Sequence, residues 1–145
     1  MKENAIIHVR GVQRCAGEEE VTELCASGTL KRTADGWIVS YEEPQPDGRV
    51  RALLRWDGTR VSLTRRGAVR SEMVFAAGER RNAFYELSVG SLTMELFTRS
   101  LRVRPDGVAL LLELEYELAI GGEALSENRL SVRMEPCGTD GEQEM

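Results

Sequence analysis

Apolar and polar residues alternate along most of the chain, from about residue 4 to residue 134. In the clearest case, Leu114 and Tyr116 alternate with Glu113, Glu115 and Glu117. Successive side chains of a β-strand point to opposite faces, so this period buries one face of each strand and leaves the other in water. We expect the leucine and tyrosine positions inside and the glutamates outside.

Turn signals interrupt this alternation at short, regular intervals. Asp-Gly occurs at 35–36, 47–48, 57–58 and 106–107, and further glycines fill most of the intervals up to 122. Such dipeptides between alternating segments are typical of β-hairpins. No stretch of ten or more residues carries a convincing helical stripe, so the sequence predicts a single all-β domain. The ten expected strands are 4–13, 21–33, 36–43, 48–56, 59–66, 68–77, 80–89, 91–104, 108–121 and 123–134.

Ten antiparallel strands joined by short links form either an up-and-down barrel or a two-sheet sandwich. Sandwiches of the Greek-key type need long crossovers, which are scarce here, so we favour the barrel. The alternation changes phase in the eighth strand, which predicts a bulge at 98–100. Gly11 and Gly28, inside strands, indicate either bends or close approaches of two backbones. A loop is expected at 15–20. The barrel domain should span 1–135, followed by a flexible acidic tail at 136–145.

Composition indicates the cellular compartment and argues against membrane, secreted and zinc-binding proteins. Nothing in the chain approaches the uninterrupted apolar length of a membrane helix, and residues 1–9 lack the features of a secretory signal. The three cysteines are odd in number and widely spaced, which indicates neither a disulfide framework nor a zinc site. We therefore expect a cytoplasmic protein without metal or other cofactor. Its oligomeric state does not follow from the sequence.

Charge is distributed unevenly along the chain. Residues 49–81 carry a net charge of +6, whereas 1–48 carry −4 and 82–145 carry −7. This basic island, 49–81, predicts either an outer face that attracts an anionic partner or solvent-facing arginines that pair with glutamates of the same sheet. Nucleic acid is not expected as a partner, because the whole chain is acidic and no aromatic residues are interleaved with the arginines.

Arg65 is the principal candidate for a binding residue. It follows Val61 and Leu63 at the same parity and should therefore point to the apolar side. Its charge then requires a carboxylate, several carbonyls or an acidic ligand group. Two interpretations remain open: Arg65 is held at the barrel rim by main-chain carbonyls or by Glu43, or it faces a ligand. The tyrosines that share the parity of apolar neighbours join it as candidates for ligand binding: Tyr41, Tyr85 and Tyr116.

Enzymatic interpretations have less support. His8 is the sole histidine, and its face is ambiguous because apolar residues precede and follow it. A base without an identifiable nucleophile is a weak case for catalysis. The glutamates at 113, 115 and 117 indicate a solvated strand face, and no phosphate-cradling glycine motif is present. We expect no enzyme and no catalytic residues.

The stretch 65–101 also resembles a known family. The run Arg65-Arg66-Gly67-Ala68-Val69-Arg70 and the later positions Met73, Phe75, Gly78, Tyr85, Gly90, Leu92, Met94, Thr98 and Leu101 are similar to the YwiB-like family of small bacterial proteins of unknown function. The similarity extends from about Ile6 to Met134. The resemblance implies a calycin-type barrel, related in architecture to lipocalins, and carries over no activity, ligand or site residue.

Two functional hypotheses follow. A barrel of this many strands leaves interior space for a small molecule, so the first is binding of a small amphipathic or acidic ligand inside. The alternative is a non-enzymatic interaction module that uses the basic outer face of strands 48–81.

Overall fold

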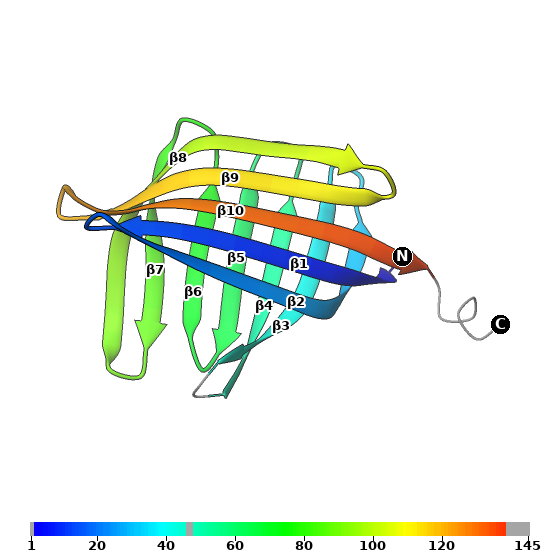
Figure 1. The fold of residues 1–145 in the computed structure, drawn as a ribbon, viewed down its shortest axis with the longest axis horizontal. Helices are drawn as coiled ribbons and strands as arrows, with labels where there is room; N and C mark the ends of the chain where they lie inside the picture. The colour runs from blue at the N-terminus through cyan, green and yellow to red at the C-terminus, as the bar shows by residue number, and fades with distance from the viewer. Residues whose placement is uncertain (1, 46–47, 139–145) are drawn as a thin grey trace.

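Ten antiparallel strands form one closed barrel in the computed structural model, which describes residues 2–45 and 48–138. Each strand pairs with its neighbours in sequence, and β1 pairs with β10 to close the circle (Figure 1). The all-β up-and-down barrel predicted from the alternation is confirmed. No helix long and apolar enough to cross a membrane occurs among the described residues.

The strand boundaries follow the turn signals closely. Most observed strands begin and end within two or three residues of the expected positions. The strands are β1 (Lys2–Cys15), β2 (Glu18–Arg32), β3 (Trp37–Gln45), β4 (Gly48–Trp56), β5 (Val61–Gly67), β6 (Arg70–Phe75), β7 (Arg80–Leu87), β8 (Gly90–Asp106), β9 (Ala109–Ile120) and β10 (Glu123–Gly138).

The barrel is flattened into two sheets that are joined at their edges by β8 and β2. In Figure 1, the second part of β8 crosses the view together with β9, β10, β1 and β2, and β3 to β7 run steeply behind them. Strand β8 pairs with β7 through its first part and with β9 through its second part, and its register shifts between Thr98 and Ser100. The bulge predicted at 98–100 is confirmed. It lets one strand turn from the first sheet into the second.

The opposite corner depends on Gly28. Strand β2 pairs with β1 along its length but with β3 only over Gly28–Arg32. A Cβ atom at Gly28 would lie 2.4 Å from the main-chain oxygen of Ser40 and 3.1 Å from the Cβ of Tyr41. Of the two readings of this glycine, a close approach of two backbones is therefore the one observed. Gly11, by contrast, has room for a side chain.

Two expected segment boundaries differ from the structure. The loop predicted at 15–20 is wrong: β1 reaches Cys15, β2 begins at Glu18, and Ala16 and Gly17 form a two-residue turn with φ of 53° and 83°. Two positive φ values are typical of the type I′ hairpin turn, which this chain makes without Asn or Asp. The tail was expected from 136, but β10 continues to Gly138, with Pro136 paired to Ala5. The remainder of that tail, 139–145, lies outside the described residues.

The core occupies the space between the two sheets. Leu54, Leu112 and Leu114 are fully buried, as their parity predicts, and Trp56 and Tyr116 pack against the core while partly exposed. The glutamates at 113, 115 and 117 lie on the outer face, where each is bridged to an arginine, so the face assignment of β9 is confirmed.

Candidate functional site

A row of inward-facing residues crosses the sheet of β3 to β7 near its open end. The registered partners run Tyr41, Ala52, Arg65, Ser71 and Tyr85, one residue from each strand. Residues that are in register on one face are direct neighbours across strands. Arg65 thus lies at the centre of the row. Its inward direction, predicted from the parity of Val61 and Leu63, is confirmed, because its row neighbours Ala52 and Ser71 are buried.

Glu43 on β3 is the partner of Arg65. The Arg65 Nε donates a hydrogen bond of 3.1 Å to the Glu43 Oε1, across the intervening strand β4. On β4, Ala52 is the partner of Arg65 and Val50 is the partner of Glu43, so the arginine crosses β4 diagonally, and the small side chain of Ala52 leaves room for it. The Glu43 side chain is 10% exposed and that of Arg65 is 22% exposed. The structure therefore matches the interpretation in which Glu43 holds the arginine.

The pair does not satisfy the whole guanidinium. This group has five N–H donors. Among the described residues, no second residue accepts a hydrogen bond from Arg65. Next to it, the Oγ of Ser71 is fully buried and lacks a hydrogen-bond partner in the described part of the chain. Buried polar groups are nearly always paired, so this row retains unused hydrogen-bonding capacity.

Burial and the Glu43–Arg65 pair also shift the pKa values of nearby tyrosines. Burial, the charge of Glu43 and a hydrogen bond to Glu43 raise the pKa of Tyr41, and nearby Arg65 opposes them. Burial raises the pKa of Tyr116 to about 12, with a contribution from Tyr85 and opposition from Arg65. For Arg65, burial lowers the pKa, but the charge of the Glu43 carboxylate and the hydrogen bond to it, with contributions from Tyr41 and Tyr85, outweigh burial and raise it. Arg65 stays charged, and Tyr41 and Tyr116 stay neutral, at neutral pH.

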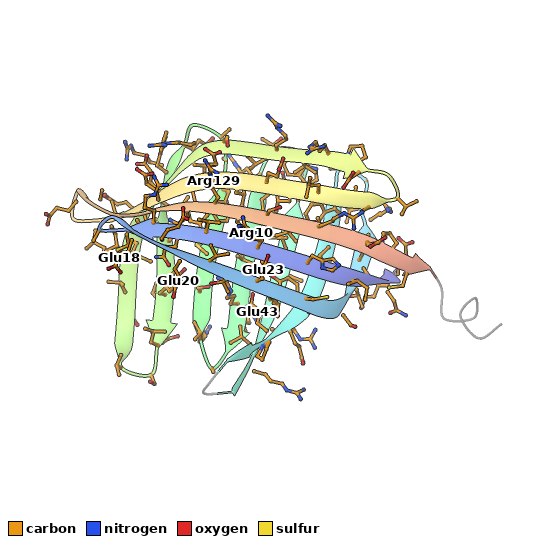
Figure 2. The ribbon with its side chains drawn as sticks, in the orientation of Figure 1. Arg10, Glu18, Glu20, Glu23, Glu43 and Arg129 are labelled. Atoms are coloured by element: carbon orange, nitrogen blue, oxygen red, sulfur yellow. The ribbon has the colours of Figure 1, made fainter. Side chains whose placement is uncertain are left out.

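Arg65 and Glu43 line a cavity of about 490 Å³ at the barrel mouth. This volume lies within the usual range of small-molecule sites, about 300–1,000 Å³. The mouth lies between β2 and the ends of the steep strands, toward the bottom of the ribbon in Figure 1. Glu43 is seen below β2 in Figure 2. The apolar part of the lining includes Val9, Val12, Leu24, Val50, Val69 and Leu130.

The four predicted site residues occupy different places around this cavity. Arg65 and Tyr116 line it, with Tyr116 contributed by β9 of the other sheet. Tyr41 is almost fully buried beside the Glu43–Arg65 pair, and Tyr85 donates a weak hydrogen bond of 3.8 Å to the Met73 sulfur. Neither of them is among the residues that line the cavity. They lie at the two ends of the row that has Arg65 at its centre.

Sequence reasoning did not include three polar positions of the interior in the site. Glu43 was considered only as a partner of Arg65, although its parity with Tyr41 places it inside. Ser71 shares the parity of Met73 and Phe75, which was the available signal. Asn128 lines the cavity and donates a 3.0 Å hydrogen bond to the Ser126 Oγ. A short polar residue in an alternating segment gives no sign that it faces a cavity.

The basic island lies mainly on the outer face and is partly neutralised there. Arg49 and Arg51 both bridge to Glu42, at 3.3 and 3.4 Å, and Arg70 bridges to Glu86. The expectation that island arginines pair with glutamates of the same sheet is correct for these. Arg80 stacks over the ring of Phe97, 4.9 Å from its centroid.

The other candidate chemistry lies away from the cavity. His8 is exposed on the outer face, in register with Cys25 and Arg133. The cysteines at 15, 25 and 137 are exposed. Within residues 2–45 and 48–138, no group of three or more His, Cys, Asp or Glu side chains is arranged to hold a metal ion.

Comparison with known proteins places this barrel in a family. A family model described as a domain of unknown function, DUF1934, matches residues 7–132, which is most of the chain. The chain belongs to the DUF1934 family. It is 25% identical over 129 residues to the uncharacterized beta-barrel protein YwiB of Bacillus subtilis, covering 89% of this chain and 91% of the relative.

A solved structure agrees with the fold. The crystal structure of the YwiB protein from Bacillus subtilis superposes with a TM-score of 0.84 at 23% identity, covering 93% of this chain and 92% of that one. The YwiB-like resemblance read from the sequence is therefore confirmed, and the calycin-type barrel that it implied fits. DUF1934 is a family of β-barrel proteins without an assigned function.

Proposed function

We propose that this DUF1934 protein binds a small amphipathic or acidic organic molecule in the cavity at the barrel mouth. The observation that carries the proposal is Arg65: a retained charge inside the barrel, with one protein partner and spare N–H donors, on the wall of a cavity of about 490 Å³. Because a guanidinium binds carboxylates and other oxyanions through paired N–H groups, an acidic ligand group fits beside Glu43.

The rest of the cavity suits an apolar body. Val9 and Leu24 face each other across β1 and β2, and Leu130 lies on the neighbouring β10. Val69 adds an apolar side chain from the turn after β5. A ligand with its acidic group at Arg65 would bury its apolar part against these residues, at about 25 cal/mol per Å² of apolar surface.

The proposal is for binding without turnover. Its support is that the sole histidine lies on the outer face, away from the cavity. The cavity wall offers carboxylates, two arginines and one tyrosine but no paired nucleophile and base among the described residues. The expected cytoplasmic location and the absence of a cofactor stay predictions.

Titration with anilinonaphthalene sulfonate, an apolar fluorescent anion, tests the proposal. We expect the dye to bind the wild type, and Arg65→Leu to weaken binding at least tenfold. Arg51→Glu and Arg60→Glu on the outer face are the matched controls and should leave binding within about twofold, after allowance for screening by salt. Equal binding by Arg65→Leu and wild type, or loss confined to the outer-face variants, would refute the cavity as the site.

A second candidate is docking of an acidic partner on the basic island. Arg55, Arg60 and Arg66 form no salt bridge within the described residues, although the first two lie near the Asp57 carboxylate. Such binding should weaken steeply as salt rises, because surface charges are screened beyond about 8 Å at physiological ionic strength. It should also be abolished by Arg60→Glu and unaffected by Arg65→Leu, the reverse of the pattern expected for the cavity.

A further inference from the structure

At one side of the barrel mouth, the edge of strand β2 is unpaired. Strand β2 pairs with β1 from Glu18 to Lys31, but with β3 only from Gly28 onward. The ten residues 18–27 therefore pair on one side alone, and their strand makes extensive contacts only with β1 and β3. The N–H and C=O groups directed away from β1 along these residues have no strand to pair with, which leaves a template for another extended chain.

The facing edge is poorly suited to such pairing. It is the end of β3, where Glu42–Gln45 also extend past the last β2–β3 pair. Pro44 lies in this segment and has no N–H to donate. Between residues 18 and 27 there is neither proline nor glycine. An incoming strand would thus add to β2.

Charge limits the kind of chain that fits. Residues 18–27 contain four glutamates and no basic residue. Glu19 and Glu23 are bridged to Arg14 and Arg10 of β1 on the outer face. Glu18 and Glu20 have the opposite parity, face the mouth, and form no ion pair with any described residue. Figure 2 shows the labelled glutamates spaced along β2, with Glu43 below them.

We propose that residues 18–27 of β2 bind a basic, extended peptide segment of a partner protein by strand addition. Main-chain hydrogen bonds to β2 supply the pairing, and lysine or arginine side chains at alternate positions of the peptide meet Glu18 and Glu20. A second copy of this chain does not fit the edge, because two β2 edges would bring four glutamates against four.

The test uses the intact protein, labelled with nitrogen-15, and a capped heptapeptide of alternating lysine and valine. We expect binding to shift the amide resonances of residues 18–27 and to slow hydrogen exchange there at least tenfold. The same peptide methylated on alternate backbone nitrogens keeps its charge but cannot pair. It should therefore not bind, and an alternating glutamate and valine peptide should not bind either.

Charge-reversal variants locate the site. Glu18→Lys/Glu20→Lys should weaken the basic peptide at least tenfold. Glu72→Lys/Glu95→Lys makes the same change of net charge at exposed positions on β6 and β8 and should leave affinity unchanged. Failure of the basic peptide to bind, binding that survives methylation, or a dimer formed through β2 would overturn the inference. Arg65→Leu should not affect the peptide, so this result is independent of the cavity proposal.

Discussion

Two neighbouring glutamates of β3 bind arginine on opposite sides of the same sheet. Glu42 points outward, with its side chain 47% exposed, and bridges to Arg49 and Arg51. Glu43 points inward, with its side chain 10% exposed, and bridges to Arg65. Both pairs form similar contacts, at 3.4 Å for Arg51 and 3.1 Å for Arg65, so their geometry hardly differs.

The difference between them lies in their surroundings. An exposed ion pair is screened by water and salt, and its partners are readily solvated if it breaks. Inside, each charge has lost much of its water, so each depends on the other or on a replacement of the same charge. A ligand acid is one such replacement. The same two residue types thus form an ordinary surface contact outside and a potential binding group inside.

The largest effect should follow removal of the inner carboxylate. Glu43→Leu leaves Arg65 without its partner, and an arginine cannot shed its charge inside the barrel. We expect the free energy of unfolding to fall by about 3 kcal/mol, the lower end for a broken buried pair, because the cavity admits some water. Denaturant titration measures it. Glu43→Leu/Arg65→Met should recover much of the loss, whereas an additive double variant would mean that the two residues act separately.

A bulky residue beneath the arginine should have the next largest effect. Ala52 is fully buried between Tyr41 and Arg65, so Ala52→Trp fills the space that the arginine crosses. We expect a loss of about 1–3 kcal/mol in unfolding free energy and loss of the fluorescent anion from the cavity. Leu53→Trp, at a partly exposed position facing outward, is the control and should change stability by less than about 0.5 kcal/mol. Equal effects of the two would show that the inner row has room to spare.

Alkaline titration tests the burial of the Tyr116 phenol inside the barrel. Burial raises the pKa of Tyr116 to about 12, above the value near 10 of an unfolded chain. The folded protein therefore holds this proton more tightly, so the contribution of Tyr116 to stability is intact below pH 10 and is lost as pH rises from 10 to 12. The stability advantage of wild type over Tyr116→Phe should shrink across that window. An advantage independent of pH there would contradict the buried position of the phenol.

The smallest effect belongs to the outer pair. Arg51→Met leaves Glu42 with Arg49 and with water, so unfolding free energy should change by less than about 1 kcal/mol. The change should shrink further in high salt. A loss as large as that of Glu43→Leu would mean that the inner and outer pairs do not differ in kind.

Strand order and facing were predictable because this fold is built from local signals. Glycine turns and a period of two define hairpins, and hairpins alone generate an up-and-down barrel. The bulge at 98–100 was visible as a phase change. The Ala16-Gly17 turn was missed because three consecutive glutamates, 18–20, gave the segment the composition of a loop, although they lie on a paired strand.

The site was less accessible to sequence reasoning. Parity placed Arg65 inside, but its partner depends on which strands adjoin and on the small size of Ala52, the neighbour of Arg65 on β4. Which inward residues reach the cavity depends on the corners at Gly28 and Thr98, where the two sheets diverge. Tyr41 and Tyr116 both share the parity of inward-facing apolar neighbours, yet only Tyr116 lines the cavity. Such differences arise from curvature, which no local pattern encodes.

Native mass spectrometry of protein purified from its own cells tests the central claim most directly. Wild type, Arg65→Met and Arg51→Met would be compared under conditions that preserve noncovalent complexes. We predict a copurified small organic acid on wild type and on Arg51→Met, and its absence from Arg65→Met. The same small molecule on all three proteins, or a complex lost only in Arg51→Met, would contradict a ligand site built on the inner arginine.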